Sequence, residues 1–251
     1  MLRITEIKHP SHRHRLTLFT SIQTSFWCDG CKEQGLESCY KCNERNCNFH
    51  LHEDCAFASS FGPITHQFFK NCSFTFHGEY QADNRNCVAC GKNVRGFMYE
   101  SSSNEALVLH PRCLKLPHSK TTSDHRVKVT LRKQVDVLLT RSKCQICNRR
   151  KLSEKIKGWA YVSDCGKHRY HVACVKDMIF NNLNNVQVLE PTEGSNTSTL
   201  SLQVQQSVFN GKKFRKYGGS IIKLIVEVII SAIFGDALSI ILTLVDVVQR
   251  N

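Results

Sequence analysis

Short clusters of aromatic and β-branched residues alternate with polar runs along the first two thirds of the chain. The clusters FTSIQTSFW, GFMYE, EALVL and WAYV each suit a β-strand of a few residues, because such side chains pack well on a half-buried pleated surface. The run CVKDMIF at residues 174–180 predicts one short helix. We therefore expect small β-frameworks that carry a single short helix each.

The C-terminal part of the chain has a different pattern. Residues 181–220 are polar and poor in aromatic side chains, which predicts a flexible linker. Residues 221–251 are mostly apolar, with a break at Gly235-Asp236, so two short amphipathic helices are expected rather than one straight span. This hydrophobic tail is long enough to insert into a bilayer, to lie on an anionic membrane surface, or to join a partner or a second copy. Four basic residues precede it, namely Lys212, Lys213, Arg215 and Lys216.

One chemical phrase occurs three times, a Cys-x-x-Cys pair followed by His-x-x-Cys. The second Cys and the His are separated by 20, 19 and 23 residues in the three copies, which is too constant for chance. The repeat predicts three modules at residues 9–66, 67–118 and 119–180. Their three ligand sets are Cys28, Cys31, His52 and Cys55; Cys87, Cys90, His110 and Cys113; and Cys144, Cys147, His171 and Cys174.

The chain has 251 residues with 14 Cys and 12 His, gathered almost wholly in these modules. A module of about 50 residues buries too little apolar surface to fold unaided, so it needs disulfides or a metal. The N-terminal residues contain no apolar run of the kind found in a signal peptide, which favours a reducing, intracellular compartment and disfavours disulfides. Three Cys and one His then indicate structural Zn²⁺, about three to six ions per chain.

Further Cys and His residues suggest a second zinc site in each module. In the first module the candidates are His12 or His14, Cys42, Cys47 and His66, with Cys39 as a competing ligand. The second module lacks a middle Cys pair, so its second site is degenerate and the nearby imidazoles are His66, His77 and His118. The third module offers Cys165, His168 and His125.

These residues resemble the plant cysteine/histidine-rich divergent C-one (DC-one) domains, relatives of the diacylglycerol/phorbol-ester-type zinc finger. The resemblance is carried by His12-Arg-His14-Arg-Leu16, Cys28-Asp-Gly-Cys31, Tyr40-Lys-Cys42 and the run from Cys47 to Cys55, CNFHLHEDC. One departure is that four residues separate Cys42 from Cys47, where the family usually has two. The resemblance implies small zinc-stabilised α+β modules in tandem.

The family role implied by the resemblance is non-catalytic recognition of proteins or lipids in intracellular signalling of the stress or defence type. Diacylglycerol is not expected as a ligand, because the span between the second and third Cys, KEQGLESCYK, is short and polar. The formal net charge of +13 fits an acidic partner or an anionic membrane equally well. Nucleic acid is not expected, because the aromatic residues suit a small module's core.

The alternative function is that of a thiol-disulfide oxidoreductase acting through the Cys-x-x-Cys pairs. Such pairs need a lowered thiol pKa at the start of a helix in a βαβ unit, and the sequence around these pairs does not predict that arrangement. No catalytic residues are expected. The chain is expected in the cytoplasm or nucleus, with membrane association through residues 212–248.

Overall fold

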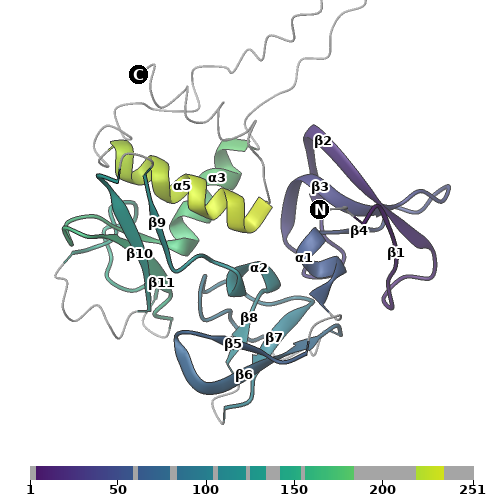
Figure 1. The fold of residues 1–251 in the computed structure, drawn as a ribbon, viewed down its shortest axis with the longest axis horizontal. Coiled ribbons are helices and arrows are strands. Elements are labelled where there is room, and N and C mark those ends of the chain that lie inside the picture. Colours follow the sequence, from purple (N-terminus) through teal and green to yellow (C-terminus); the bar gives the residue numbers. More distant parts are fainter. Residues whose placement is uncertain are drawn as a thin grey trace, which may run out of the picture.

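A computed structural model describes residues 4–58, 62–79, 84–103, 107–122, 125–133, 142–153, 156–183 and 219–234. Three four-stranded antiparallel sheets follow one another along the chain, and a helix comes after each (Figure 1). The predicted fold class of small strand-rich modules with few short helices is confirmed. The linker was predicted over residues 181–220, but its first three residues end one helix and its last two begin another. Residues 184–218, with the four basic residues, and everything after Phe234 lie outside the described residues.

The first module consists of β1 (Glu6–Lys8), β2 (Arg15–Trp27), β3 (Gln34–Cys42), β4 (His50–Leu51) and the helix α1 (Glu53–Ala56). The strands pair in sequence order, and the long β2–β3 hairpin has an irregular register between Thr20 and Ser25. Leu16, Tyr40 and Leu51 are fully buried beneath this sheet. Apolar side chains from one face of the hairpin therefore form the module's own small core.

The second and third modules repeat this order of elements. The second contains β5 (Ile64–His66), β6 (Phe69–His77), β7 (Met98–Ser101), β8 (Val108–Leu109) and α2 (Pro111–Leu114). The third contains β9 (Ser119–Thr121), β10 (Lys128–Lys133), β11 (Trp159–Ser163), β12 (Arg169–His171) and α3 (Val172–Leu183). Because β5 pairs with β6, the second sheet begins at residue 64, slightly before the boundary expected from the sequence.

The three modules pack against one another through backbone and side-chain contacts. The amide of Phe97 in the second module donates to the carbonyl oxygen of Gly30 in the first at 2.9 Å. The amide of Trp159 in the third donates to the carbonyl oxygen of Ala89 in the second at 2.8 Å. The buried indole of Trp159 also stacks on His66, with ring centroids 4.9 Å apart. One apolar cluster contains residues from all three modules, so they form a single body.

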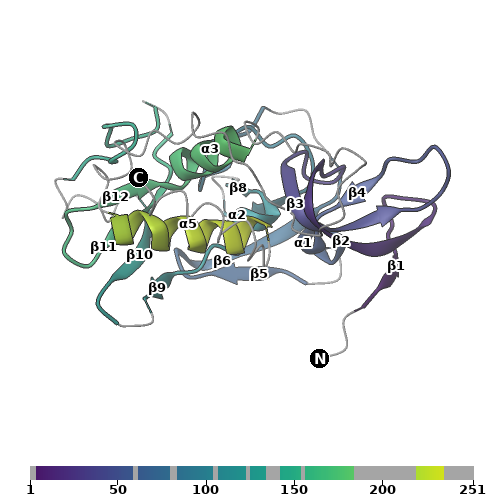
Figure 2. The ribbon, with the colours of Figure 1, turned by 90° about the horizontal axis from the view of Figure 1, so that it is seen from above.

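The beginning of the hydrophobic tail forms the helix α5 (Gly219–Phe234), which lies on this body beside α3 (Figures 1 and 2). The helix contacts β3 of the first module, α2 of the second, and α3, β9 and β10 of the third. Ile222, Ile225 and Ile229 are fully buried, whereas Ser231 is exposed. In the part of the chain described, no helix combines the length and apolar character needed to cross a membrane.

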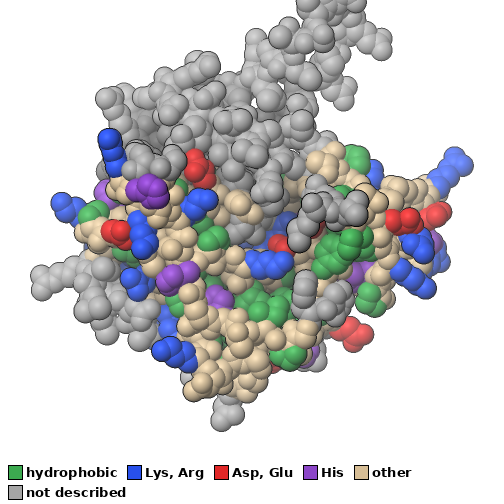
Figure 3. Space-filling model, in the orientation of Figure 1, with side chains coloured by type: hydrophobic (Ala, Val, Ile, Leu, Met, Phe, Trp, Pro, Cys, Tyr) green, Lys and Arg blue, Asp and Glu red, His purple; other side chains and the backbone are tan. Residues whose placement is uncertain are grey.

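Basic side chains are distributed over the visible face of the body rather than gathered in one place. Lys and Arg lie over both the first and the third module in Figure 3, with fewer Asp and Glu between them. The positive charge of the described surface is therefore diffuse in this view.

Candidate metal centres

Each Cys-x-x-Cys pair lies on a tight turn with the same backbone hydrogen bonds. The amides of Lys32, Gly91 and Asn148 donate to the carbonyl oxygen of the first Cys of their pair, at 2.9, 2.7 and 2.8 Å. All three residues have positive φ, of 58°, 70° and 56°. Glycine adopts this conformation without cost and asparagine tolerates it. The turn folds the two sulfur atoms toward the same point.

A further hydrogen bond joins each turn to the strand that leads to the His. The amide of the residue after the first Cys donates to the carbonyl oxygen of the residue two positions before the His, and the three distances are 2.8, 3.0 and 2.9 Å. The pairs are Asp29 with His50, Val88 with Val108, and Gln145 with Arg169. Although 19 to 23 residues intervene, the two halves of each ligand set are held together by backbone.

The His and the last Cys of each set are brought together by the start of a helix. His52 and His110 are the N-cap residues of α1 and α2, and His171 directly precedes α3. A residue three positions further along lies on the same face of the helix. The ring nitrogen Nδ1 therefore approaches the sulfur of the following Cys, to 3.8 Å in the first set, 3.9 Å in the second and 3.8 Å in the third.

All four ligand atoms of each set lie within 4.8 Å of one another. The Nδ1 atom of the His also lies 3.3 to 3.4 Å from the sulfur of the second Cys in each set. In a zinc tetrahedron with sulfur at about 2.3 Å and nitrogen at about 2.0 Å, neighbouring ligand atoms are about 3.6 Å apart. The three sets have the dimensions of tetrahedral zinc sites. We refer to them below as centres 1, 2 and 3, in chain order.

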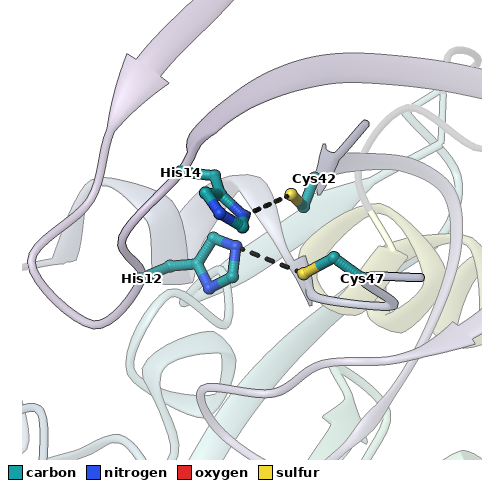
Figure 4. Close-up of side chains that lie close together, drawn as sticks. All are labelled: His12, His14, Cys42 and Cys47. Atoms are coloured by element: carbon teal, nitrogen blue, oxygen red, sulfur yellow. Dashed lines mark hydrogen bonds between the residues drawn. The ribbon is translucent and has the colours of Figure 1, made fainter. Parts of the chain in front are cut away.

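A fourth cluster lies in the first module and contains His12, His14, Cys42 and Cys47 (Figure 4). Nδ1 of His14 lies 3.4 Å from the sulfur of Cys42, and Nε2 of His12 lies 3.5 Å from that of Cys47. His12 stacks on Phe49, with ring centroids 4.2 Å apart, which fixes its orientation. The sequence offered His12 and His14 as alternatives, and the structure brings both to the cluster. We call it centre 4.

The remaining predicted ligands belong to none of the four clusters found among the described residues. His66 is buried against Trp159, and burial lowers its pKa to about 4. His118 lies beside Phe68, and His125 is exposed in a turn. Cys165 is exposed and contacts the hydroxyl of Ser163. These side chains therefore take part in packing and surface turns rather than in a second metal cluster of modules two and three.

Two other residues weighed as ligands from the sequence also lie elsewhere. Cys39 is buried in β3, and burial raises the pKa of its thiol to about 11. His77 ends β6, where its Nε2 lies 3.6 Å from a carboxylate oxygen of Glu100. Since β-strand side chains alternate between faces, Cys39 cannot share the position of Cys42 three residues later in the same strand. Cys42 is the residue that joins centre 4.

The donor chemistry of the clusters fits a divalent cation. In centre 3 a hydrogen bond with Cys174 lowers the pKa of Cys144 to about 3, and the same contact raises that of Cys174 far above its usual range. In centre 2 hydrogen bonds with the neighbouring thiols lower the pKa of Cys90 and raise that of Cys113. Within one cluster, an ionised thiol therefore makes ionisation of its neighbour less favourable. Zinc removes this opposition, because it binds each of the thiols as thiolate.

The comparison with protein families bears on the first module. Residues 10–56 match the family model of the C1 domain. The first module is therefore similar to the C1 domain. The matched residues include all ligands of centres 1 and 4, so the four clusters are compatible with structural zinc binding as in C1 domains. No curated protein and no solved structure gives a significant match to the chain.

Reasoning from the sequence missed a group of buried charges near the centres. Lys176 of α3 donates to Oε1 of Glu33 at 2.7 Å, and the same oxygen lies 3.6 Å from Nδ1 of His110 in centre 2. Burial opposes the charge of Lys176, yet Glu33 outweighs it and raises the lysine pKa well above its usual value. The position of this lysine within the apolar run CVKDMIF was the sequence feature that could have indicated a buried charge.

Proposed function

We propose that this chain is a non-catalytic scaffold that binds other proteins in intracellular signalling, with zinc holding its modules folded. The observation that carries the proposal is that every cluster supplies four protein ligand atoms. A tetrahedral zinc ion held in this way has no open position for water or substrate, which is the arrangement of structural rather than catalytic sites. Free thiols placed for metal binding also suit a reducing compartment.

The burial of the Cys-x-x-Cys sulfurs in the first two modules favours this proposal over a thiol-disulfide oxidoreductase. Cys28, Cys31, Cys87 and Cys90 are each at most 1% exposed, whereas a redox-active pair must present one sulfur to its substrate. None of the three pairs opens a helix of eight residues or more within the described chain. The short α1 and α2 begin at the His of the set instead.

The first module carries the most exposed large apolar side chain described, Trp27, which is 68% exposed at the end of β2. Aromatic side chains of this type are enriched at the centres of protein interfaces. The span between Cys31 and Cys42, which in lipid-binding relatives includes a ligand loop, is largely occupied by β3. These features support a protein partner on the first module rather than diacylglycerol.

The test uses the zinc-loaded full chain as bait in cross-linking capture, together with an insulin-reduction assay on the same preparation. A specific partner captured by the wild type should be lost with Trp27→Ala but kept with Phe19→Ala, a change on the same strand. We expect no reduction of insulin by the zinc-loaded protein. Isolation of a metal-free protein that turns over dithiols and disulfides would contradict the proposal and support the oxidoreductase.

The membrane anchor predicted from residues 212–248 remains a separate proposal. The apolar face of α5 packs on the three modules, so this helix must leave the body before it can enter a lipid interface. Charge reversal of the four basic residues should weaken flotation with anionic vesicles in a salt-dependent way if they contribute. Unchanged flotation at low salt would show that these residues do not bind the membrane.

A further inference from the structure

Three Lys or Arg side chains are buried among the described residues. Arg112, Arg169 and Lys176 are 3%, 0% and 1% exposed. A buried charge costs several kcal/mol unless an opposite charge lies nearby, so each of these cations needs a negative partner. Only Lys176 has a carboxylate within ion-pairing distance, namely Glu33, among the ion pairs of the described chain.

Lys176 lies beside centre 2 although it is two residues from Cys174 of centre 3. Its Nζ atom and Nδ1 of His110 both contact the same oxygen of Glu33, at 2.7 and 3.6 Å. The distance between Nζ of Lys176 and Nδ1 of His110 therefore cannot exceed the sum of these two distances. The thiols of Cys90 and Cys113 also favour the charged form of Lys176. Lys176 is a single cation between two anionic groups, the Glu33 carboxylate and the thiolates of centre 2.

Arg112 shows the same crossing between modules. It lies in α2 next to Cys113 of centre 2. Burial lowers the pKa of the His52 imidazole in centre 1, and the Arg112 guanidinium lowers it further. The outer ion pair between Lys115 and Asp54 holds α2 against α1 at this place. Two buried nitrogens of Arg112, Nε and Nη1, have no hydrogen-bond partner among the described residues. Among the described residues, no carboxylate forms an ion pair with this buried guanidinium.

Arg169 lies beside centre 3 of its own module. Its Nη2 atom donates to the carbonyl oxygen of Arg150 at 2.9 Å, and Nε2 of His171 contacts the same oxygen at 3.3 Å. The proton on Nε2 leaves Nδ1 of His171 free to bind metal. Burial lowers the pKa of the Arg169 guanidinium, and the thiols of Cys144 and Cys147 oppose this by favouring its charged form.

The number of buried cations equals the number of centres that would carry a net negative charge. Zinc held by three thiolates and one imidazole carries one net negative charge, whereas zinc held by two thiolates and two imidazoles is neutral. Centres 1, 2 and 3 are of the first kind, and centre 4 is of the second. Each of the first three has one buried cation beside it, and none of the three described buried cations is associated with centre 4.

We propose that Arg112, Lys176 and Arg169 are the counter-cations of centres 1, 2 and 3, and that the first two are supplied across module boundaries. Centre 1 then depends on the second module, and centre 2 on the third. Metal retention in one module is in this way a property of the assembled body.

The test replaces Lys176 by the neutral, similarly long Met in the full zinc-loaded chain. Thiol alkylation followed by mass spectrometry is measured during a challenge with a zinc chelator. Loss of a residue that supports a metal ligand lowers metal affinity by about 10–100-fold. We expect Cys87, Cys90 and Cys113 to lose protection first. If the substitution acted only on its neighbours in sequence, Cys144, Cys147 and Cys174 would lose protection first, because Cys174 is two residues from Lys176.

The matched control is Lys92→Met, which removes the exposed Lys92–Asp177 ion pair between the same two modules. This variant should protect centre 2 as the wild type does. Lys176→Arg keeps the cation and should also keep the protection. The proposal is overturned if Lys176→Arg fails as badly as Lys176→Met, if all centres are exposed together, or if centre 3 is exposed first.

The double variant Glu33→Gln with Lys176→Met separates the two anionic partners of the lysine. It removes the carboxylate that Lys176→Met leaves buried and unpaired, so partial recovery of protection is expected. Complete recovery would show that Lys176 serves Glu33 alone and would overturn its role at the thiolates. By the same design, Arg112→Met should expose centre 1 before centre 2, and exposure in the reverse order would contradict the assignment of Arg112.

Discussion

Gly96 is a position at which a single methyl group should separate two modules. A Cβ atom at residue 96 would lie 1.9 Å from the carbonyl oxygen of Gly30, which belongs to the backbone of the first module. The same oxygen accepts the hydrogen bond from the amide of Phe97 at 2.9 Å. Because the added Cβ is fixed to one backbone and the oxygen it meets belongs to another, no side-chain rotation can relieve the clash. Gly96→Ala must therefore displace one module from the other.

The magnitude follows from the contacts that the displacement breaks. Forcing an extra carbon into a packed site costs about 1–3 kcal/mol, and loss of the Phe97–Gly30 hydrogen bond adds about 1 kcal/mol. Reduced freedom of the unfolded chain returns about 0.4–1 kcal/mol. We expect a net loss of about 2 kcal/mol in the free energy of unfolding. The ring of Phe97, 4% exposed in the core of the first module, should become more exposed.

The assay is urea unfolding of the zinc-loaded protein followed by circular dichroism. With a slope of about 2 kcal/mol per molar urea, the loss corresponds to a midpoint lower by about 1 M. Gly62→Ala is the matched control, because a Cβ at that position meets no atom within 4 Å. Equal midpoints for Gly96→Ala and Gly62→Ala would refute the close packing of the first two modules.

Three further outcomes are expected. The four clusters use eleven of the 14 Cys, so the zinc-loaded protein should react with a thiol label readily at the exposed Cys165. A zinc chelator should make the eleven thiols reactive and unfold the sheets. An unchanged circular dichroism spectrum after verified metal removal would show that zinc does not stabilise the fold. Trp159→Ala should cost about 3–5 kcal/mol of stability by thermal unfolding, because the indole fills the contact between the second and third modules; a change below about 1 kcal/mol would contradict that contact. Ile225→Asp places a charge on the buried face of α5 and should speed proteolysis near the helix, whereas Ser231→Asp on the exposed face should not; equal rates would mean that α5 is not held on the body.

The parts of the structure that could be predicted from the sequence are those encoded within a few residues. Cys-x-x-Cys makes a turn that aims two sulfurs at one point, and His-x-x-Cys places a ring nitrogen and a sulfur on one helical face. The strands could also be predicted, because their segments are rich in aromatic and β-branched residues. Even so, the sequence could not choose between His12 and His14, because both lie within reach of the Cys42–Cys47 loop.

The packing of the modules could not be predicted in this way, because it depends on contacts between residues far apart in sequence. Lys176 and Glu33 are separated by 143 positions, so the apolar surroundings of the lysine could not indicate which residue it pairs with. The apolar residues of α5 were equally suited to lipid, to a partner or to a second copy. Their burial depends on an apolar surface that exists only after the three modules have assembled.

The position of α5 at the end of the described chain has a consequence for synthesis on the ribosome. The surface on which it packs is built from elements that end at Leu183, and about 51 residues follow before α5 ends at Phe234. At about 5–20 residues per second, the assembled modules wait roughly 3–10 s before the helix that covers them has been made. During this interval the apolar surface is open to water and to other nascent chains. A chaperone that shields apolar surface would act on this intermediate, and a chain truncated before Gly219 would keep that surface exposed.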